Sequence, residues 1–168
     1  AVDEFNRIYV IDYVRKRGLA VLGIQGSDTK GIVDYIFDIN TSSHPSLFCI
    51  EETTMSRPVF QALQAEMLRR NDFTVKYREE KPGTRQSKRD RIQSILAQRF
   101  SVGQIHIKKE HYDLNREITT FGPRMAHDDT IDALAYACKY AYADSNIHQN
   151  KEGTYYKHKP VPKSWVIA

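Results

Sequence analysis

The sequence predicts an α/β domain, because segments with the composition of strands alternate with segments of helical periodicity. Its 168 residues suffice for one domain with a substantial core. Hydrophobic residues make up 40% and charged residues 27%, as in an ordinary globular protein. No apolar run approaches the roughly 18 residues that a membrane span needs. The predicted domain covers residues 1–143 and is followed by a basic and aromatic tail at 144–168.

Residues 7–51 contain two predicted strands and one predicted helix. Residues 7–14 are rich in β-branched and aromatic side chains and predict the first strand, which ends at a turn. Asp28 is the predicted N-cap of the helix, whose apolar residues recur at helical spacing as far as Ile39. The near-continuous apolar run 47–50 predicts a strand buried on both faces, and it stops at Glu51.

The chain after residue 51 continues this alternation. Ser56 begins a helix that carries Pro58 in its first turn, where the missing backbone N–H is least costly. A strand is predicted at 73–77, and a helix with one apolar face at 88–100. The remaining predicted elements are a polar loop at 78–87, a strand at 104–107, a short helix at 112–121 and an acidic helix after Pro123.

Three carboxylates lie within five positions at the start of this acidic helix: Asp128, Asp129 and Asp132. Asp128 or Asp129 can cap the helix by accepting from its unpaired backbone N–H groups. Asp132 lies one turn further along the same face. Because carboxylates that converge repel each other, a divalent cation would stabilise the group. The alternative is a capped helix whose additional acids face water.

Two further features suggest a site for a phosphate-containing partner. Glu51 stands where a predicted strand meets solvent, and ligand sites in α/β sheets favour the carboxyl ends of strands. The segment 81–91 has five basic residues and one acidic residue, an excess of +4 that equals the net charge of the whole chain. A basic loop near an acidic group is explained by contacts with a nucleic-acid backbone beside a metal site. The basic residues are Lys81, Arg85, Lys88, Arg89 and Arg91.

Three motifs stand out along the chain: Phe48-Cys49-Ile50-Glu51, Gln86-Ser87-Lys88-Arg89 at a helix start, and His127-Asp128-Asp129 with Asp132-Ala133. In these motifs the sequence resembles the nuclease domain of the terminase large subunits of tailed bacteriophages. The order and spacing of the motifs cover most of residues 7–143. The resemblance implies an RNase H-like mixed β-sheet flanked by helices. It also implies a metal-dependent endonuclease that cuts concatemeric viral double-stranded DNA during genome packaging in the host cytoplasm.

The resemblance also assigns roles to the acids. Glu51 matches the second acidic position of the family and Asp129 the third, with Asp128 as an auxiliary ligand. Asp132 matches a further carboxylate of the related Holliday-junction resolvases. These four residues would hold two Mg²⁺ or Mn²⁺ ions, which stabilise the attacking hydroxide and the leaving 3′ oxygen in phosphodiester hydrolysis. The five basic residues of 81–91 would bind DNA phosphates without reading sequence.

The chain departs from the family pattern in two ways. The first catalytic Asp of the family lies on a strand before the one predicted at 7–14, so this strand and its acid are expected upstream of Ala1. Asp3 is then predicted to lie in a turn and Asp12 in the second strand of the sheet. The sequence also has no G-x-x-x-x-G-K-[ST] phosphate loop, so the ATPase motor is expected elsewhere in the same polypeptide.

Two other functions remain open from the sequence. One is a non-catalytic module of the packaging motor that docks DNA or the portal protein through its basic loop and tail. The other is a junction resolvase, which would share the fold. Under the terminase interpretation, the expected partners are double-stranded DNA, the portal protein and the small terminase subunit.

Overall fold

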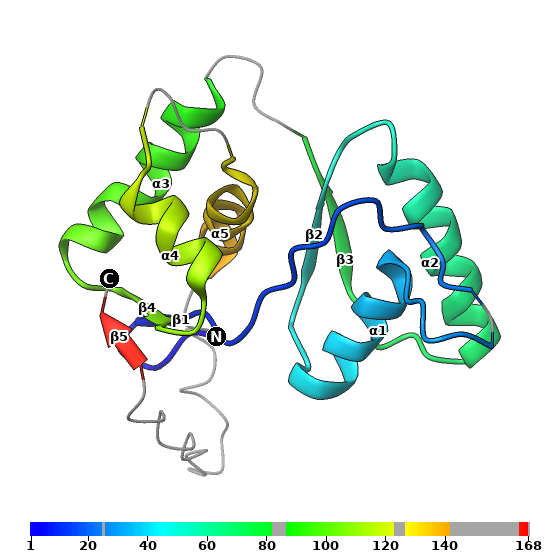
Figure 1. The fold of residues 1–168 in the computed structure, drawn as a ribbon. Coiled ribbons are helices and arrows are strands. Elements are labelled where there is room, and N and C mark those ends of the chain that lie inside the picture. The colour runs from blue at the N-terminus through cyan, green and yellow to red at the C-terminus, as the bar shows by residue number, and fades with distance from the viewer. Residues whose placement is uncertain (25, 82–86, 123–126, 142–164, 168) are drawn as a thin grey trace, which may run out of the picture. The chain divides into compact units, whose positions relative to one another are not determined.

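The chain divides into two compact units, which we describe one at a time: unit 1 (1–15 and 85–168) and unit 2 (16–84). The computed structural model describes residues 1–24, 26–81, 87–122, 127–141 and 165–167 (Figure 1). The described residues form a mixed α/β structure with short, mostly parallel strands, which confirms the predicted class. None of their five helices is long and apolar enough to cross a membrane.

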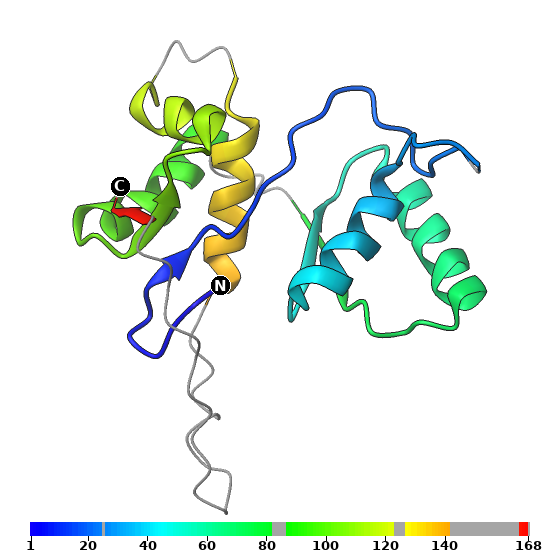
Figure 2. The same ribbon diagram turned by 60° about the horizontal axis from the view of Figure 1, so that its bottom comes forward.

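Unit 1 combines a three-stranded sheet with three helices that lie beside one another in both ribbon views (Figure 1, Figure 2). Its elements are β1 (Ile8–Tyr9), α3 (Lys88–Ser101), β4 (Ile105–Lys108), α4 (Tyr112–Thr119), α5 (Asp129–Tyr140) and β5 (Trp165–Ile167). The central strand, β4, pairs in parallel with β1 and antiparallel with β5. Segments from both ends of the sequence therefore flank a strand from its second half.

The core of unit 1 lies between its sheet and its helices. Helix α3 contributes Ile92 and Leu96, and α5 contributes Ile131 and Ala135, each an i, i+4 pair with at most 3% of either residue exposed. Burial of each large aliphatic side chain stabilises the fold by about 1.5–3 kcal/mol. The helix predicted at 88–100 is confirmed, and the Ser87 hydroxyl caps it by accepting a hydrogen bond from the third backbone N–H of α3.

Strand β1 is shorter than the predicted 7–14. Its last sheet hydrogen bond runs from Val10 N to His106 O. Beyond that point Ile11 O accepts from the Lys108 side chain (2.7 Å) instead of from a strand backbone, so the ladder stops. The prediction that Asp12 lies in this strand is therefore wrong.

Asp3 occupies the turn that the sequence predicts. Its Oδ1 accepts hydrogen bonds from the backbone N–H groups of Phe5 and Arg7, and its Oδ2 accepts from Arg7 Nε. This bonding engages both oxygens of the Asp3 carboxylate within the turn. At the other end of the chain, residues 165–167 of the predicted tail form β5, while 142–164 lie outside the described residues.

Among the described residues of unit 1, two histidines are buried, and burial lowers the pKa of each below its ordinary 6.5. His106 stacks on Tyr9 at 4.7 Å between ring centroids, and His111 lies edge-on to Tyr13 at 5.1 Å. Both rings are therefore more readily protonated in the unfolded chain than in the folded one.

This difference predicts how the stability of unit 1 depends on pH. The contribution of the neutral histidines is complete above about pH 6.5 and decreases as the pH falls below it, because unfolding then takes up protons. We expect the free energy of unfolding to fall from about pH 7.5 to about pH 5.5 in urea titrations followed by circular dichroism. His106→Phe keeps a ring stacked on Tyr9 and removes one titrating group. The free energy of unfolding of this variant should therefore depend less steeply on pH. An equal slope in this variant would contradict the assignment to His106.

Unit 2 is built around a strand–helix–strand segment. Its elements are α1 (Ile32–Ser43), β2 (Phe48–Glu51), α2 (Ser56–Arg70) and β3 (Tyr77–Glu80). Strands β2 and β3 are parallel and in register, from Phe48 opposite Tyr77 to Glu51 opposite Glu80. Helices α1 and α2 lie on the same side of the two strands (Figure 1, Figure 2), and the core between them contains Val33, Phe37, Leu63 and Val75. The crossover brings the carboxyl ends of both strands to one edge.

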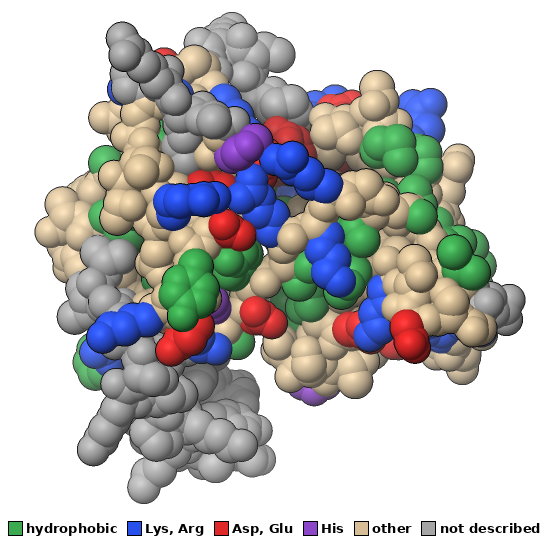
Figure 3. Space-filling model, viewed as in Figure 1, with side chains coloured by type: hydrophobic (Ala, Val, Ile, Leu, Met, Phe, Trp, Pro, Cys, Tyr) green, Lys and Arg blue, Asp and Glu red, His purple; other side chains and the backbone are tan. Residues whose placement is uncertain are grey.

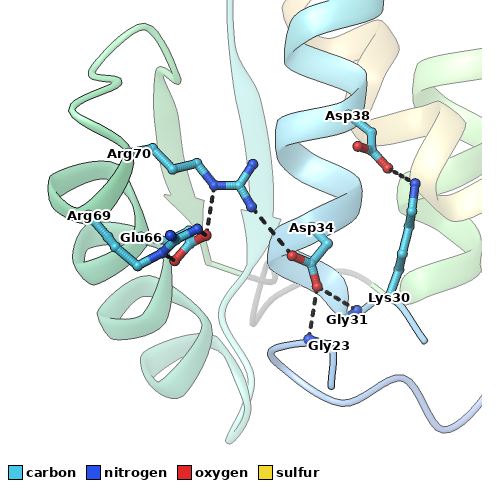
Figure 4. A network of polar contacts seen from close by, with 8 residues as sticks. All are labelled: Gly23, Lys30, Gly31, Asp34, Asp38, Glu66, Arg69 and Arg70. Atoms are coloured by element: carbon cyan, nitrogen blue, oxygen red, sulfur yellow. Dashed lines mark hydrogen bonds and ion pairs between the residues drawn. The ribbon is translucent and has the colours of Figure 1, made fainter. Parts of the chain in front are cut away.

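Helix α1 begins three residues later than predicted. Asp34 lies in its first turn and accepts hydrogen bonds at Oδ2 from Gly31 N (2.9 Å) and Gly23 N (2.8 Å) (Figure 4). A Cβ atom on Gly31 would lie 2.4 Å from the backbone of Leu22, so the close approach of these segments requires glycine. The N-cap is Gly31, and the prediction of Asp28 is wrong.

An ion-pair network joins the two helices of unit 2 (Figure 4). Glu66 binds both Arg69 and Arg70, with N–O distances of 2.6 and 2.7 Å, and Arg70 extends to Asp34 at 3.5 Å. The hydrogen bond from Arg69, supported by Arg70 and opposed by partial burial, lowers the pKa of Glu66 to about 2. Both guanidinium groups are thus engaged within the unit.

The strands of unit 2 differ from prediction in burial and position. Strand β2 is half-buried along its length, so the expectation of a strand covered on both faces is wrong. Strand β3 begins at Tyr77 and extends into the predicted polar loop, whereas Phe73 lies outside it and is 60% exposed.

Candidate metal centre

The start of helix α5 is capped from another helix. Glu117 of α4 accepts hydrogen bonds at Oε2 from the backbone N–H groups of Thr130 and Ile131, both at 2.9 Å. Its residue is only 2% exposed, and its other oxygen lies 3.4 Å from the Arg15 guanidinium. Asp128 is the N-cap residue but its side chain makes no capping bond, so the prediction that Asp128 or Asp129 caps the helix is wrong.

Because Glu117 supplies the cap, Asp128 and Asp132 are available for another role. They are four residues apart and face the same side of α5. Lys88, the first residue of α3, places its Nζ 2.7 Å from Asp128 and 3.3 Å from Asp132. Partial burial disfavours the charged lysine, but the hydrogen bond to Asp128 and the charge of Asp132 outweigh it, so the pKa of Lys88 is raised.

Asp132 has a second basic partner. Arg91 Nη2 lies 2.9 Å from Asp132 Oδ1, and the same guanidinium covers the ring of Tyr136 at 4.2 Å. The Asp132 side chain is 8% exposed and that of Arg91 14%, so this pair lies inside the packing of α3 against α5. Arg91 Nη2 also donates a hydrogen bond to Asp132 Oδ2 at 3.2 Å, so Arg91 engages both oxygens of this carboxylate.

Asp129 does not join this pair of acids. Its side chain is 67% exposed, and its nearest basic partner is Arg15, at 3.7 Å. Asp129 thus lies on the Arg15 side of the helix start, together with Glu117 and Asp113. On the visible face of unit 1, basic and acidic side chains are intermixed instead of forming two separate patches (Figure 3).

The other predicted site residues are distributed over the chain. Glu51 ends β2 in unit 2, half-buried and in register with Glu80 of β3. Lys81 follows β3 in the same unit and is exposed, as is Arg89 on α3 of unit 1. Arg85 lies outside the described residues. The structure therefore groups Lys88, Arg91, Asp128 and Asp132, and describes Glu51 in a separate unit.

The grouped acids provide part of a metal site. Within the described residues, no three His, Cys, Asp or Glu side chains are arranged to hold an ion. Asp128 and Asp132 nevertheless present oxygens to a single positively charged nitrogen, Lys88 Nζ, through Asp128 Oδ1 and Asp132 Oδ2. Oxygen-only donors suit hard divalent cations such as Mg²⁺ and Mn²⁺. The pair thus fits a cation but supplies fewer ligands than such an ion usually takes.

Sequence reasoning missed three residues at these positions: Arg15, Glu80 and Glu117. Glu117 could have been found, because it lies three residues after the buried Leu114 and so falls on the apolar face of α4. A carboxylate at such a position needs a partner. Nothing local indicated Arg15 or Glu80, whose neighbours come from distant parts of the chain.

Comparison with known proteins leaves the family of this chain open. No family model, no curated protein and no solved structure matches it. The resemblance to terminase nucleases therefore rests on the three sequence motifs. Two of these motifs, the start of α3 and the start of α5, contribute the residues that meet at Lys88.

Proposed function

We propose that the chain is the nuclease portion of a phage DNA-packaging terminase, a metal-dependent endonuclease that cuts concatemeric viral double-stranded DNA. The observation that carries the proposal is the approach of Asp128 and Asp132 to one cationic nitrogen, at 2.7 and 3.3 Å. Acids arranged around a positive charge are what a metal-dependent nuclease requires. The resemblance of the three motifs to terminase nucleases is the basis for the reaction class and for the viral setting in the host cytoplasm. It is also the basis for the portal protein and the small terminase subunit as partners.

An RNase H-like arrangement of the whole domain belongs to this proposal. It is supported by the parallel β2–α2–β3 segment, which carries Glu51 at a strand end, and by the acids at the start of α5. Ligand sites in α/β sheets lie at carboxyl ends of strands.

The acids would act as ligands and not as bases. Asp128 and Asp132 would hold a cation on one side of α5, while Glu51 and Asp129 would complete the ligand set. When bound, Mg²⁺ or Mn²⁺ would stabilise the attacking hydroxide and the leaving 3′ oxygen. Glu117 caps α5 and Arg15 pairs with Glu117, so the two residues together would fix the orientation of the first turn of α5.

The proposal is tested by plasmid nicking with the purified protein. We expect Mn²⁺ or Mg²⁺ to be required and EDTA to abolish cleavage. Substitution of Asp128 and Asp132 together by Asn should remove activity while circular dichroism stays unchanged. Nicking that persists in EDTA, or in the folded double variant, would exclude this metal centre.

DNA binding provides a separate prediction for the basic segment. Arg89 and Lys88 lie at the exposed start of α3, where phosphates also meet unpaired backbone N–H groups. Replacing Arg85, Lys88 and Arg89 by Ala should reduce the slope of log affinity against log salt by roughly two to three units, with little change in sequence preference. An unchanged slope in fluorescence anisotropy would place the DNA on another surface.

A second candidate function is a non-catalytic docking module for DNA or the portal protein. It is favoured by the fact that all three acids at α5 have basic partners, as in a purely structural network. The nicking assay separates the two, because a docking module would bind DNA and leave the plasmid intact under every metal condition.

A further inference from the structure

We propose that Lys88 is a built-in counter-cation of the acid pair Asp128 and Asp132, which a divalent metal ion must displace in order to bind. This inference rests on the proposed function, since it concerns the regulation of the same metal centre. Lys88 Nζ approaches both carboxylates from the start of α3. It therefore occupies the position in which a shared cation would contact the two acids.

The charges of the group are balanced before any metal binds. Asp128 and Asp132 contribute two negative charges, and Lys88 and Arg91 contribute two positive charges. Addition of a divalent cation to this neutral group would leave it with an excess of positive charge beside two cationic side chains. Departure of one basic group restores attraction between the acids and the metal.

Lys88, and not Arg91, is the group that can leave. The Lys88 side chain is 43% exposed and ends a flexible four-carbon stem, so it can turn to solvent without disturbing the core. The Arg91 side chain is 14% exposed and lies over the ring of Tyr136. Arg91 therefore remains with Asp132, which keeps that carboxylate oriented on its packed side.

Release of Lys88 also has a consequence for DNA. Its ammonium group lies at the start of α3, next to Arg89, in the segment expected to contact phosphates. A lysine that is freed by the metal becomes available to the DNA backbone, so metal binding and phosphate binding would support each other. Linkage requires this coupling to act in both directions.

The test is Mn²⁺ binding to the whole chain without DNA, measured by electron paramagnetic resonance of the free ion. Lys88→Met keeps the length of the stem and removes the charge. We expect it to bind Mn²⁺ more tightly than the wild type by up to about fivefold, the upper end of the range for a partly exposed ion pair. Arg89→Met is the matched control: it makes the same change in net charge at the next residue, where the described residues show no ion pair to either acid. Its affinity should stay close to that of the wild type.

Each result decides between the two proposals. Equal affinities of the wild type and Lys88→Met, both lost when Asp128 and Asp132 become Asn, would overturn the role of Lys88 and leave the metal centre intact. An equal gain in Mn²⁺ affinity in Lys88→Met and Arg89→Met would show that the effect comes from net charge alone, and it would also overturn the role of Lys88. If Mn²⁺ binding is unchanged by the double Asn substitution, or is absent from every variant, the metal centre of the proposed function is excluded.

Discussion

Replacement of Glu117 by Ala is expected to destabilise unit 1 by about 3 to 5 kcal/mol, the cost of breaking a buried ion pair. The Glu117 carboxylate accepts the backbone N–H groups of Thr130 and Ile131 and faces Arg15. Alanine would leave two buried donors without their acceptor, because the residue is 2% exposed and water cannot replace it. It would also remove the buried one of the three acids that face Arg15. The free energy of unfolding in urea, followed by circular dichroism, measures the loss.

Two further variants make the Glu117 experiment specific. Glu117→Gln keeps an oxygen for the helix start and loses the charge that faces Arg15, so its cost should be smaller than that of alanine. Glu110→Ala removes an exposed carboxylate of the same unit and should change stability by less than about 0.5 kcal/mol. Hydrogen exchange of the Thr130 and Ile131 amides should accelerate in the alanine variant. If these amides stay protected, the start of α5 is held by other contacts.

Helix α3 could be predicted closely because its signals are local. Ser87 caps it, Asp90 lies in its first turn, and Ile92 and Leu96 repeat at helical spacing, so no distant residue is needed to define it. The start of α1 shows the limit of such signals. Asp28 has the right chemistry for a cap, but Asp34 reaches back to Gly31 and Gly23 and takes that role. That choice depends on how a preceding loop folds onto the helix.

The acidic group was predictable as a set of residues but not as an arrangement. Spacing alone places Asp128 and Asp132 on one face of a helix. Their partners Lys88 and Arg91 precede them by about forty positions, and the two pairs meet only because α3 packs against α5. The charge balance of the group is therefore a property of the packing. For the same reason, the sequence could not separate Asp129 from the other two acids.

Glu51→Gln and Asp129→Asn are each expected to reduce metal-dependent DNA cleavage by at least about 100-fold, because the proposed function makes both carboxylates direct metal ligands. Both substitutions keep the size of the side chain and remove its charge. Glu51 is half-buried at the end of β2, and Asp129 is 67% exposed at the start of α5, so neither change should unfold the chain. DNA affinity at moderate salt should persist, since phosphate contacts come from the basic residues.

Controls with matched charge make the loss of cleavage interpretable. Glu52→Gln changes the exposed neighbour of Glu51, and Glu110→Gln changes an exposed acid in the unit of Asp129; both should cleave at the wild-type rate. Plasmid nicking with Mn²⁺ gives the rates, and anisotropy with labelled duplex gives the affinities. Full activity of Asp129→Asn would leave Asp128 and Asp132 as the acids of α5 that hold the metal, in agreement with their shared approach to Lys88. Full activity of Glu51→Gln would remove unit 2 from the metal centre, and Glu80, its neighbour in register on β3, would then be the next carboxylate to replace.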